Sequence, residues 1–157
     1  MFQLAREYQA AGASTVLLTA SAHLAVEQLG QAEACFEIDS LQAILQLEKA
    51  LPPGIVLLHG RRVETERVAG LAAELLVEVC ALADRAKLPL LVEADGSRRR
   101  PLKAPGEHEP PIPAWVETVL VLVGLMGIGQ PLTTEWVHRP ESFSLLSGLA
   151  PGAPVSQ

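Results

Sequence analysis

Apolar residues follow two different spacings along this chain. A spacing near 3.6 residues, typical of amphipathic helices, predicts helices over residues 2–11, 41–51 and 66–87, with a weak helix over 24–29 and one further turn over 141–146. Short continuous apolar runs predict buried strands over residues 15–19, 55–58, 90–92 and 118–123. Strands alternating with helices predict an α/β fold in three layers, a mostly parallel sheet with helices on both faces.

The length of 157 residues suits one domain, so residues 1–157 are predicted to form a single α/β domain. Hydrophobic residues make up 49% of the chain and charged residues 19%, which favours a globular protein over a disordered one. The chain opens inside a helix with no strand before it and closes on a tail rich in Gly and Pro. We therefore expect the domain to be incomplete at both ends. A sheet edge left open in this way tends to pair, so a homodimer is one expected assembly.

Charge and composition narrow the classes of function. A formal net charge of −6 argues against nucleic acid as a partner, because such proteins need basic surface. Cys35 and Cys80 lack the spacing of a zinc site and are predicted to be buried free thiols. The N-terminus lacks the pattern of a secretion signal, and no run approaches the roughly 20 apolar residues of a membrane span. The predicted location is the cytoplasm, with no membrane contact.

Candidate site residues stand directly after the predicted strands. In open α/β sheets, ligands bind outside the carboxyl ends of the strands, and Thr19 and His59 take such positions. Both are candidate ligand-binding residues. A run of glycines, Gly124, Gly127 and Gly129, follows the last predicted strand, and its order indicates a turn and not a dinucleotide-binding loop.

The richest strand end lies between residues 90 and 113. Glu93 and Asp95 are two residues apart and share a face of an extended strand, so both could serve one catalytic site. A strand that ends in a carboxylate is typical of a site for Mg²⁺ beside nucleotide phosphates, with Asp95 as the candidate metal ligand. The alternative is an ordinary strand followed by an Asp-Gly turn.

Four basic residues follow these acids within one loop. Arg98, Arg99, Arg100 and Lys103 could bind phosphate or carboxylate through paired hydrogen bonds. The alternative for any one of the arginines is a solvated basic run. The loop therefore combines carboxylates that suit a metal with cations that suit an anion.

The residues of this loop resemble a family signature, that of the selenium-dependent hydroxylase accessory proteins, the YqeC-like family. The resemblance rests on Glu93-Ala-Asp-Gly-Ser97, Pro101-Leu-Lys-Ala-Pro105, His108-Glu-Pro110 and Ile112-Pro113. It continues through Gly124-Leu-Met-Gly-Ile-Gly129, Pro131-Leu132 and Val137-His-Arg-Pro-Glu141, and thus covers most of the chain.

The resemblance implies a P-loop NTPase-like fold and a role in maturing selenium-dependent molybdenum hydroxylases. Carried over residue by residue, it implies catalytic roles for Glu93 and Asp95. It implies ligand or phosphate binding by Gly96, Arg98, Lys103, His108 and Glu109, and points less firmly to His138 and Arg139. Mg²⁺ with ATP or GTP would be the cofactors, and a molybdenum hydroxylase or its maturation proteins the partners.

One departure from the family affects the expected mechanism. Members usually begin with a strand and a Gly-rich loop ending in Gly-Lys-Thr, which cradles phosphates, and this sequence has no such loop. We therefore expect a fold truncated at its N-terminus and weak or absent nucleotide binding. Two functions stay open: a nucleotide-dependent maturation enzyme, or a non-catalytic scaffold that docks a client enzyme or an anionic cofactor such as a molybdopterin phosphate.

Overall fold

The computed structural model describes residues 1–156, and the chain divides into two compact units. Unit 1 is Met1–Ala94, and unit 2 begins at Asp95. That the two units form the single domain expected from the sequence stays a prediction. Within the described residues, no helix has the length and apolar character needed to cross a membrane.

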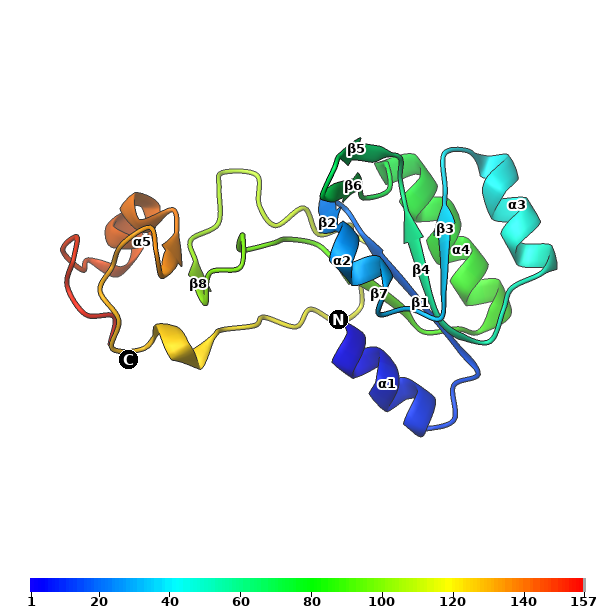
Figure 1. Cartoon of the computed structure of the whole chain (residues 1–157), viewed down its shortest axis with the longest axis horizontal. Coiled ribbons are helices and arrows are strands. Elements are labelled where there is room, and N and C mark those ends of the chain that lie inside the picture. The colour runs from blue at the N-terminus through cyan, green and yellow to red at the C-terminus, as the bar shows by residue number, and fades with distance from the viewer. Residues whose placement is uncertain (157) are drawn as a thin grey trace. The chain divides into compact units, whose positions relative to one another are not determined.

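Unit 1 is built on a parallel sheet of four strands in the order β3-β4-β1-β7 (Figure 1). Their bounds are β1 (Thr15–Ala20), β3 (Ala34–Glu37), β4 (Gly54–His59) and β7 (Leu90–Glu93). In register, Leu17 of β1 lies opposite Val56 of β4, and Thr19 lies opposite Val92 of β7. The predicted α/β class with a parallel sheet is confirmed. The P-loop NTPase-like topology stays a prediction.

The central strands are buried because helices cover both faces of this sheet. Every residue of β1 is buried, as are residues 55–58 of β4, which explains why these strands read as continuous apolar runs. Helix α1 (Phe2–Ala10) packs Phe2 and Ala5 against alternate residues of β1. Helices α3 (Leu41–Lys49) and α4 (Ala73–Ala86) pack against each other and add further buried residues: Ile44, Leu47, Leu76, Val79, Leu82 and Ala83.

A small antiparallel sheet occupies the stretch where the sequence predicted helix. Strands β2 (His23–Ala25), β6 (Arg67–Ala69) and β5 (Arg62–Glu64) form it, and α2 (Val26–Leu29) follows β2. The helix predicted over 66–87 therefore begins only at Ala73, and the one over 24–29 is reduced to a single turn. Both predictions failed because Val68 and Leu24 are buried opposite each other across β2 and β6.

The prediction that both cysteines are buried is wrong. Cys35 is exposed, because β3 is an edge strand whose residues are alternately half-buried and exposed. Cys80 on α4 is half-buried. Both are free of disulfide bonds, as predicted.

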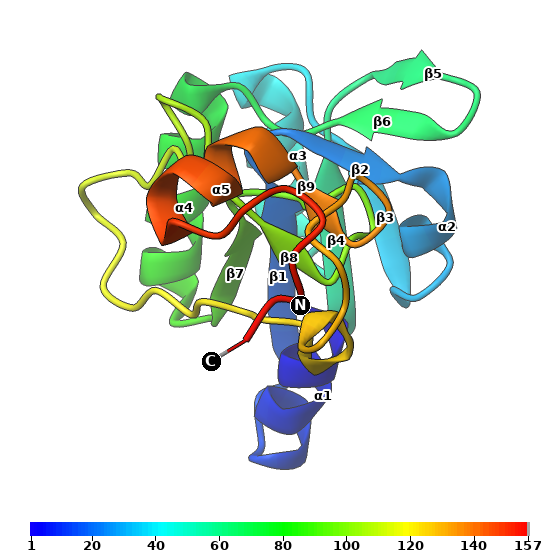
Figure 2. The same ribbon diagram turned by 90° about the vertical axis from the view of Figure 1, so that its left-hand side faces the viewer.

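Unit 2 contains little regular structure. Two short strands, β8 (Leu102–Lys103) and β9 (Val137–His138), pair in parallel, as Figure 2 shows. The 3₁₀ turn η1 (Leu125–Gly127) and helix α5 (Pro140–Ser147) complete it, and Leu102, Leu132, Val137 and Val155 form its buried core. Gly124 has to be glycine for a close approach, because an added Cβ would lie 2.7 Å from Cα of Pro101. The glycine run thus forms a turn, as predicted.

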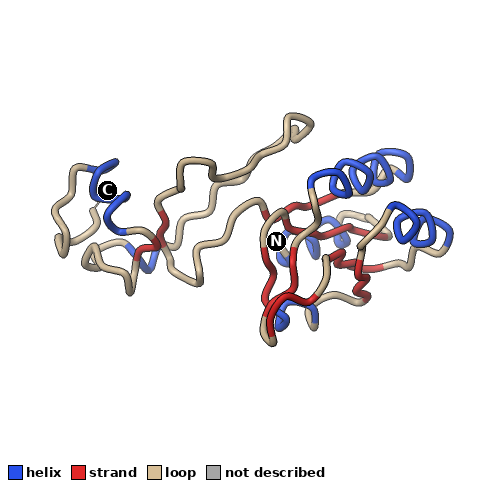
Figure 3. The backbone as a smooth tube through the Cα atoms, turned by 90° about the horizontal axis from the view of Figure 1, so that it is seen from above, coloured by secondary structure: helices blue, strands red, loops and turns tan. Residues whose placement is uncertain are grey.

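The strand predicted over residues 118–123 is absent. This segment is drawn as loop in Figure 3, and its side chains are exposed. Within the described residues of unit 2, its backbone forms no hydrogen bonds with other backbone groups. An apolar run forms a strand only where a partner strand is present to pair with it.

Candidate functional site

The predicted site residues of unit 1 lie at the carboxyl ends of its central strands. Thr19 lies near the end of β1, His59 is the last residue of β4, and Glu93 is the last residue of β7. Because the three strands are parallel neighbours, these ends meet along one edge of the sheet. A parallel sheet, as predicted from the sequence, brings these three strand ends together.

Contacts with the segment after β1 and with α2 hold the end of β7. The backbone N–H of Ser21 donates to the carbonyl of Glu93 over 3.1 Å, and its hydroxyl donates to the carbonyl of Ala94 over 3.0 Å. The Gln28 amide donates to the Glu93 carboxylate over 3.4 Å. Sequence reasoning missed Gln28, because no motif links α2 to β7. The half-buried Glu93 keeps capacity for further hydrogen bonds, and its catalytic role stays a prediction.

Thr19 and His59 differ in what they could offer a ligand. The Thr19 hydroxyl is fully buried and has no hydrogen-bond partner within residues 1–156, an arrangement that costs free energy. The His59 ring lies with Nδ1 2.7 Å from the carbonyl oxygen of Gly60. A carbonyl only accepts, so Nδ1 carries the proton and Nε2 of the neutral ring is an acceptor. Ligand binding by either residue stays a prediction.

Four charged side chains of the signature form an ionic network in unit 2: Asp95, Lys103, Glu109 and Arg139. The Arg139 guanidinium binds Glu109 through two parallel hydrogen bonds of 2.6 and 2.9 Å. The Lys103 ammonium lies 2.7 Å from Glu109 and also donates to Asp95. Paired Arg–carboxylate contacts are among the stronger ionic contacts in proteins.

The short parallel strands bring this ionic network together. Pairing of β8 with β9 sets Lys103 opposite His138. Arg139 follows β9 directly, and its guanidinium also donates to the carbonyl of Ala104 over 3.3 Å. The backbone N–H of Gly106 donates to the Glu109 carboxylate over 3.3 Å and closes the turn that carries it. Residues about 30 positions apart in sequence thus meet at one carboxylate.

The network changes the pKa values of two of its side chains. The hydrogen bonds from Arg139, and then from Lys103, hold the pKa of Glu109 far below its usual range. The same Glu109 carboxylate raises the pKa of Arg139. Both groups therefore stay charged at neutral pH, and the bidentate pair persists.

His138, beside the network, is shifted toward its neutral form. Burial lowers its pKa, and the nearby cations of Arg139, Arg98 and Lys103 lower it further. A neutral imidazole can accept a hydrogen bond or bind a metal through one nitrogen. This surplus of cations around His138 indicates a local field that favours anions.

The ionic network occupies most of the hydrogen-bonding capacity of its members. Lys103 donates to Asp95, to Glu109 and, over 3.0 Å, to the carbonyl of Gly96, and an ammonium has three protons to donate. Both oxygens of Glu109 accept hydrogen bonds. A phosphate that bound Lys103 would have to replace one of these partners. The predicted phosphate-binding roles of Gly96, Lys103 and Glu109 stay predictions.

The arginines next to the network lie in a tight turn formed by residues 97–100, which we call the arginine turn. Its hydrogen bonds run from Arg100 N–H to the Ser97 carbonyl, over 3.0 Å, and from the Ser97 hydroxyl to the Arg100 carbonyl, over 2.6 Å. Arg98 and Arg99 have φ of 52° and 63°, in the left-handed region that few side chains adopt. Both side chains are exposed. Arg100 donates to the carbonyls of Thr134 and Arg98.

The remaining predicted ligand residue, His108, is exposed in the turn between Gly106 and Glu109. Within the described residues, no group of three or more His, Cys, Asp or Glu side chains is placed to hold a metal ion. Mg²⁺ commonly needs only one or two carboxylates besides water and phosphate oxygens. Asp95 as a magnesium ligand therefore stays a prediction.

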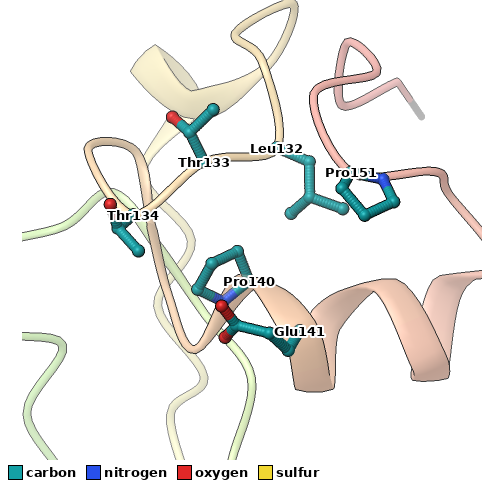
Figure 4. A pocket seen from close by; sticks show the side chains of 6 residues that line it. All are labelled: Leu132, Thr133, Thr134, Pro140, Glu141 and Pro151. Atoms are coloured by element: carbon teal, nitrogen blue, oxygen red, sulfur yellow. The ribbon is translucent and has the colours of Figure 1, made fainter.

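Of two hollows described in unit 2, one is lined by a predicted site residue, Lys103. The smaller, about 220 Å³, is lined by Leu132, Thr133, Thr134, Pro140, Glu141 and Pro151 near the start of α5 (Figure 4). None of these is a predicted site residue. The larger, about 580 Å³, includes Ser97, Arg100 and Lys103 together with apolar side chains. The larger hollow is the better candidate for a ligand, because cations and apolar surface meet there.

Comparison with known proteins identifies the family. The family model described as YqeC protein matches residues 1–141. The chain belongs to the YqeC family. An uncharacterized protein YqeC of Escherichia coli (strain K12) is 40% identical over 96 residues, which cover 60% of this chain and 36% of that protein. The chain thus matches about a third of the length of this relative. No solved structure matches the chain.

Proposed function

We propose that this chain serves in the maturation of selenium-dependent molybdenum hydroxylases by binding a phosphate-bearing anion through the arginine turn of unit 2. The maturation role is drawn from the resemblance of the residues between Glu93 and Glu141 to the family signature. The observation that carries the binding step is the exposure of Arg98 beside the ionic network.

The charges around the turn favour an anion although the whole chain is acidic. Within the ionic network, two carboxylates balance two cations, so Arg98 and Arg100 of the turn add local positive charge. Arg binds phosphate through its planar fork of N–H donors. Arg98 lies in the left-handed region of backbone conformation, and such strain is found more often at functional sites.

The residues of unit 2 also fit the magnesium ion that would accompany a nucleotide. Asp95 offers a carboxylate three residues before Arg98, and in the structure it accepts a hydrogen bond from Lys103. Bound there, Mg²⁺ would neutralise phosphate charge. Lys103 and the ion would share Asp95, while the arginine turn would orient the phosphate. Docking of a molybdenum hydroxylase or its maturation proteins would then deliver the anion to the client.

Calorimetric titration with pyrophosphate, Mg²⁺–ATP and Mg²⁺–GTP tests the binding step. The change is Arg98→Ala, and Arg6→Ala on α1 is the matched control because Arg6 is also an exposed arginine. We expect Arg98→Ala to weaken binding by about tenfold, since a charged hydrogen bond contributes roughly 1.5–3 kcal/mol. Equal affinities of Arg98→Ala and the wild type would contradict the proposal.

Two further measurements separate binding from chemistry and from maturation. Release of phosphate from ATP or GTP would show that the bound anion is hydrolysed. Hydroxylase activity in cells that lack this protein should be restored by the wild type and by Arg6→Ala, but not by Arg98→Ala. Full restoration by Arg98→Ala would show that maturation does not depend on the arginine turn.

A further inference from the structure

Residues 118–123 form an exposed apolar segment in unit 2, with the sequence Thr-Val-Leu-Val-Leu-Val. The exposed fractions of Val121 and Leu122 reach 83% and 85%. Within the described residues of unit 2, none of its backbone N–H and C=O groups forms a hydrogen bond with another backbone group. The segment thus exposes both apolar side chains and unpaired backbone.

This combination is typical of a strand that pairs with another chain. Valine and leucine runs of low charge and without proline have a high tendency to pair as strands. Leu125 and Met126, each 76% exposed, extend the apolar surface beyond the segment. Contiguous apolar patches of this kind mark interaction sites in soluble proteins.

We propose that residues 118–123 pair antiparallel with the same residues of a second copy of this chain, forming a two-fold symmetric dimer. The segment suits itself as a partner because Val and Leu alternate from Val119 to Val123, so apolar residues of one copy can lie opposite apolar residues of the other. With the two-fold axis between Leu120 and Val121, Leu120 lies opposite Val121 and Val119 opposite Leu122. Apolar cross-strand pairs of this kind stabilise a sheet.

Charge complementarity at the ends of the segment also favours a second copy. In this register Glu117 lies opposite Gly124 of the second copy. The N–H of Gly124 donates to the carbonyl of Pro101 over 2.8 Å. Arg100 directly precedes Pro101 in the sequence, and it lines the same hollow as Gly124. Arg100 donates only to backbone carbonyls within the described residues, so its charge lacks a carboxylate. The exposed Glu117 of the second copy would supply one.

Sedimentation equilibrium of the full chain over a range of concentrations tests the dimer. We expect the wild type to dimerise and Leu122→Lys to weaken dimerisation by about tenfold or more, because a lysine would be buried in an apolar contact. Leu145→Lys on α5 is the control, since Leu145 is 87% exposed and lies outside the segment. A monomeric wild type, or a Leu122→Lys variant that still dimerises fully, would overturn the proposal.

A charge exchange tests the register without touching the apolar residues. Glu117→Arg and Arg100→Glu should each weaken the dimer by roughly two- to fivefold, as expected for an exposed ion pair, and the double variant should restore it. Circular dichroism would verify that each variant is folded. A double variant that dimerises no better than the single ones would contradict the antiparallel register and with it the proposal.

Discussion

In unit 1, strands β1 and β4 are buried along nearly their whole length, whereas the two-residue strands of unit 2 rest on four buried residues and an ionic network. The first arrangement takes its free energy mainly from apolar burial, at about 1.5–3 kcal/mol for each large aliphatic side chain. The second depends on a few charged hydrogen bonds between distant loops. The comparison shows that the framework and the signature loop of one chain are stabilised by different means.

Removal of buried side chains should have the largest effect and should distinguish the two units. Leu57→Ala, in the centre of β4, should lower the free energy of unfolding by about 2–5 kcal/mol. Leu132→Ala in the smaller core of unit 2 should cost less, because its neighbours can relax into the space. Urea denaturation followed by circular dichroism measures both.

Leu145→Ala is the control for these two changes, since the side chain is exposed and the change should stay within about 0.5 kcal/mol. A Leu132→Ala variant that loses more stability than Leu57→Ala would reverse the comparison.

A change in the ionic network should act locally in unit 2. Glu109→Gln keeps the shape of the side chain but removes the charge that Arg139 and Lys103 bind. Amide hydrogen exchange should quicken between residues 102 and 109 and around β9, while β1 and β4 keep their protection. Glu141→Gln on α5 offers a matched control outside the network. Unchanged exchange in unit 2 would show that the network contributes nothing to its order.

The pH dependence of stability tests the contribution of Glu109 to the ionic network. The pKa of Glu109 is lowered by folding, so its contribution is complete above its ordinary value of 4.5 and is lost as the pH falls below it. The stability difference between the wild type and Glu109→Gln should therefore be constant from pH 7 to about 5.5 and shrink toward pH 3. A difference that grows as the pH falls would contradict the assigned direction.

The sequence predicted unit 1 better than unit 2 for a physical reason. Long buried elements such as β1, β4 and α1 impose a periodic apolar pattern, and that pattern was read correctly. Strands β5 and β6 have three residues each, too few to show a period. Strands β8 and β9 have two each, and their pairing joins residues about 35 positions apart. Local patterns hold no information on such pairing.

The candidate site was predicted in its residues but not in its connections. The signature named Asp95, Lys103 and Glu109, and pointed less firmly to Arg139. That these four side chains bind one another depends on the register of β8 with β9, which no spacing in the sequence gives. The run at residues 118–123 predicted a strand, yet a strand also needs a partner, and the described residues of unit 2 provide none.

The most direct test of the account is the location of the bound anion, which we place at the arginine turn of unit 2 and not at the strand ends of unit 1. Nuclear magnetic resonance of the ¹⁵N-labelled chain, titrated with Mg²⁺–ATP, would map it. We predict that amide signals shift at residues 96–100 and 103–109 and that those of Thr19 and His59 stay in place. Shifts confined to Thr19, His59 and Glu93, or no shift at all, would contradict the account.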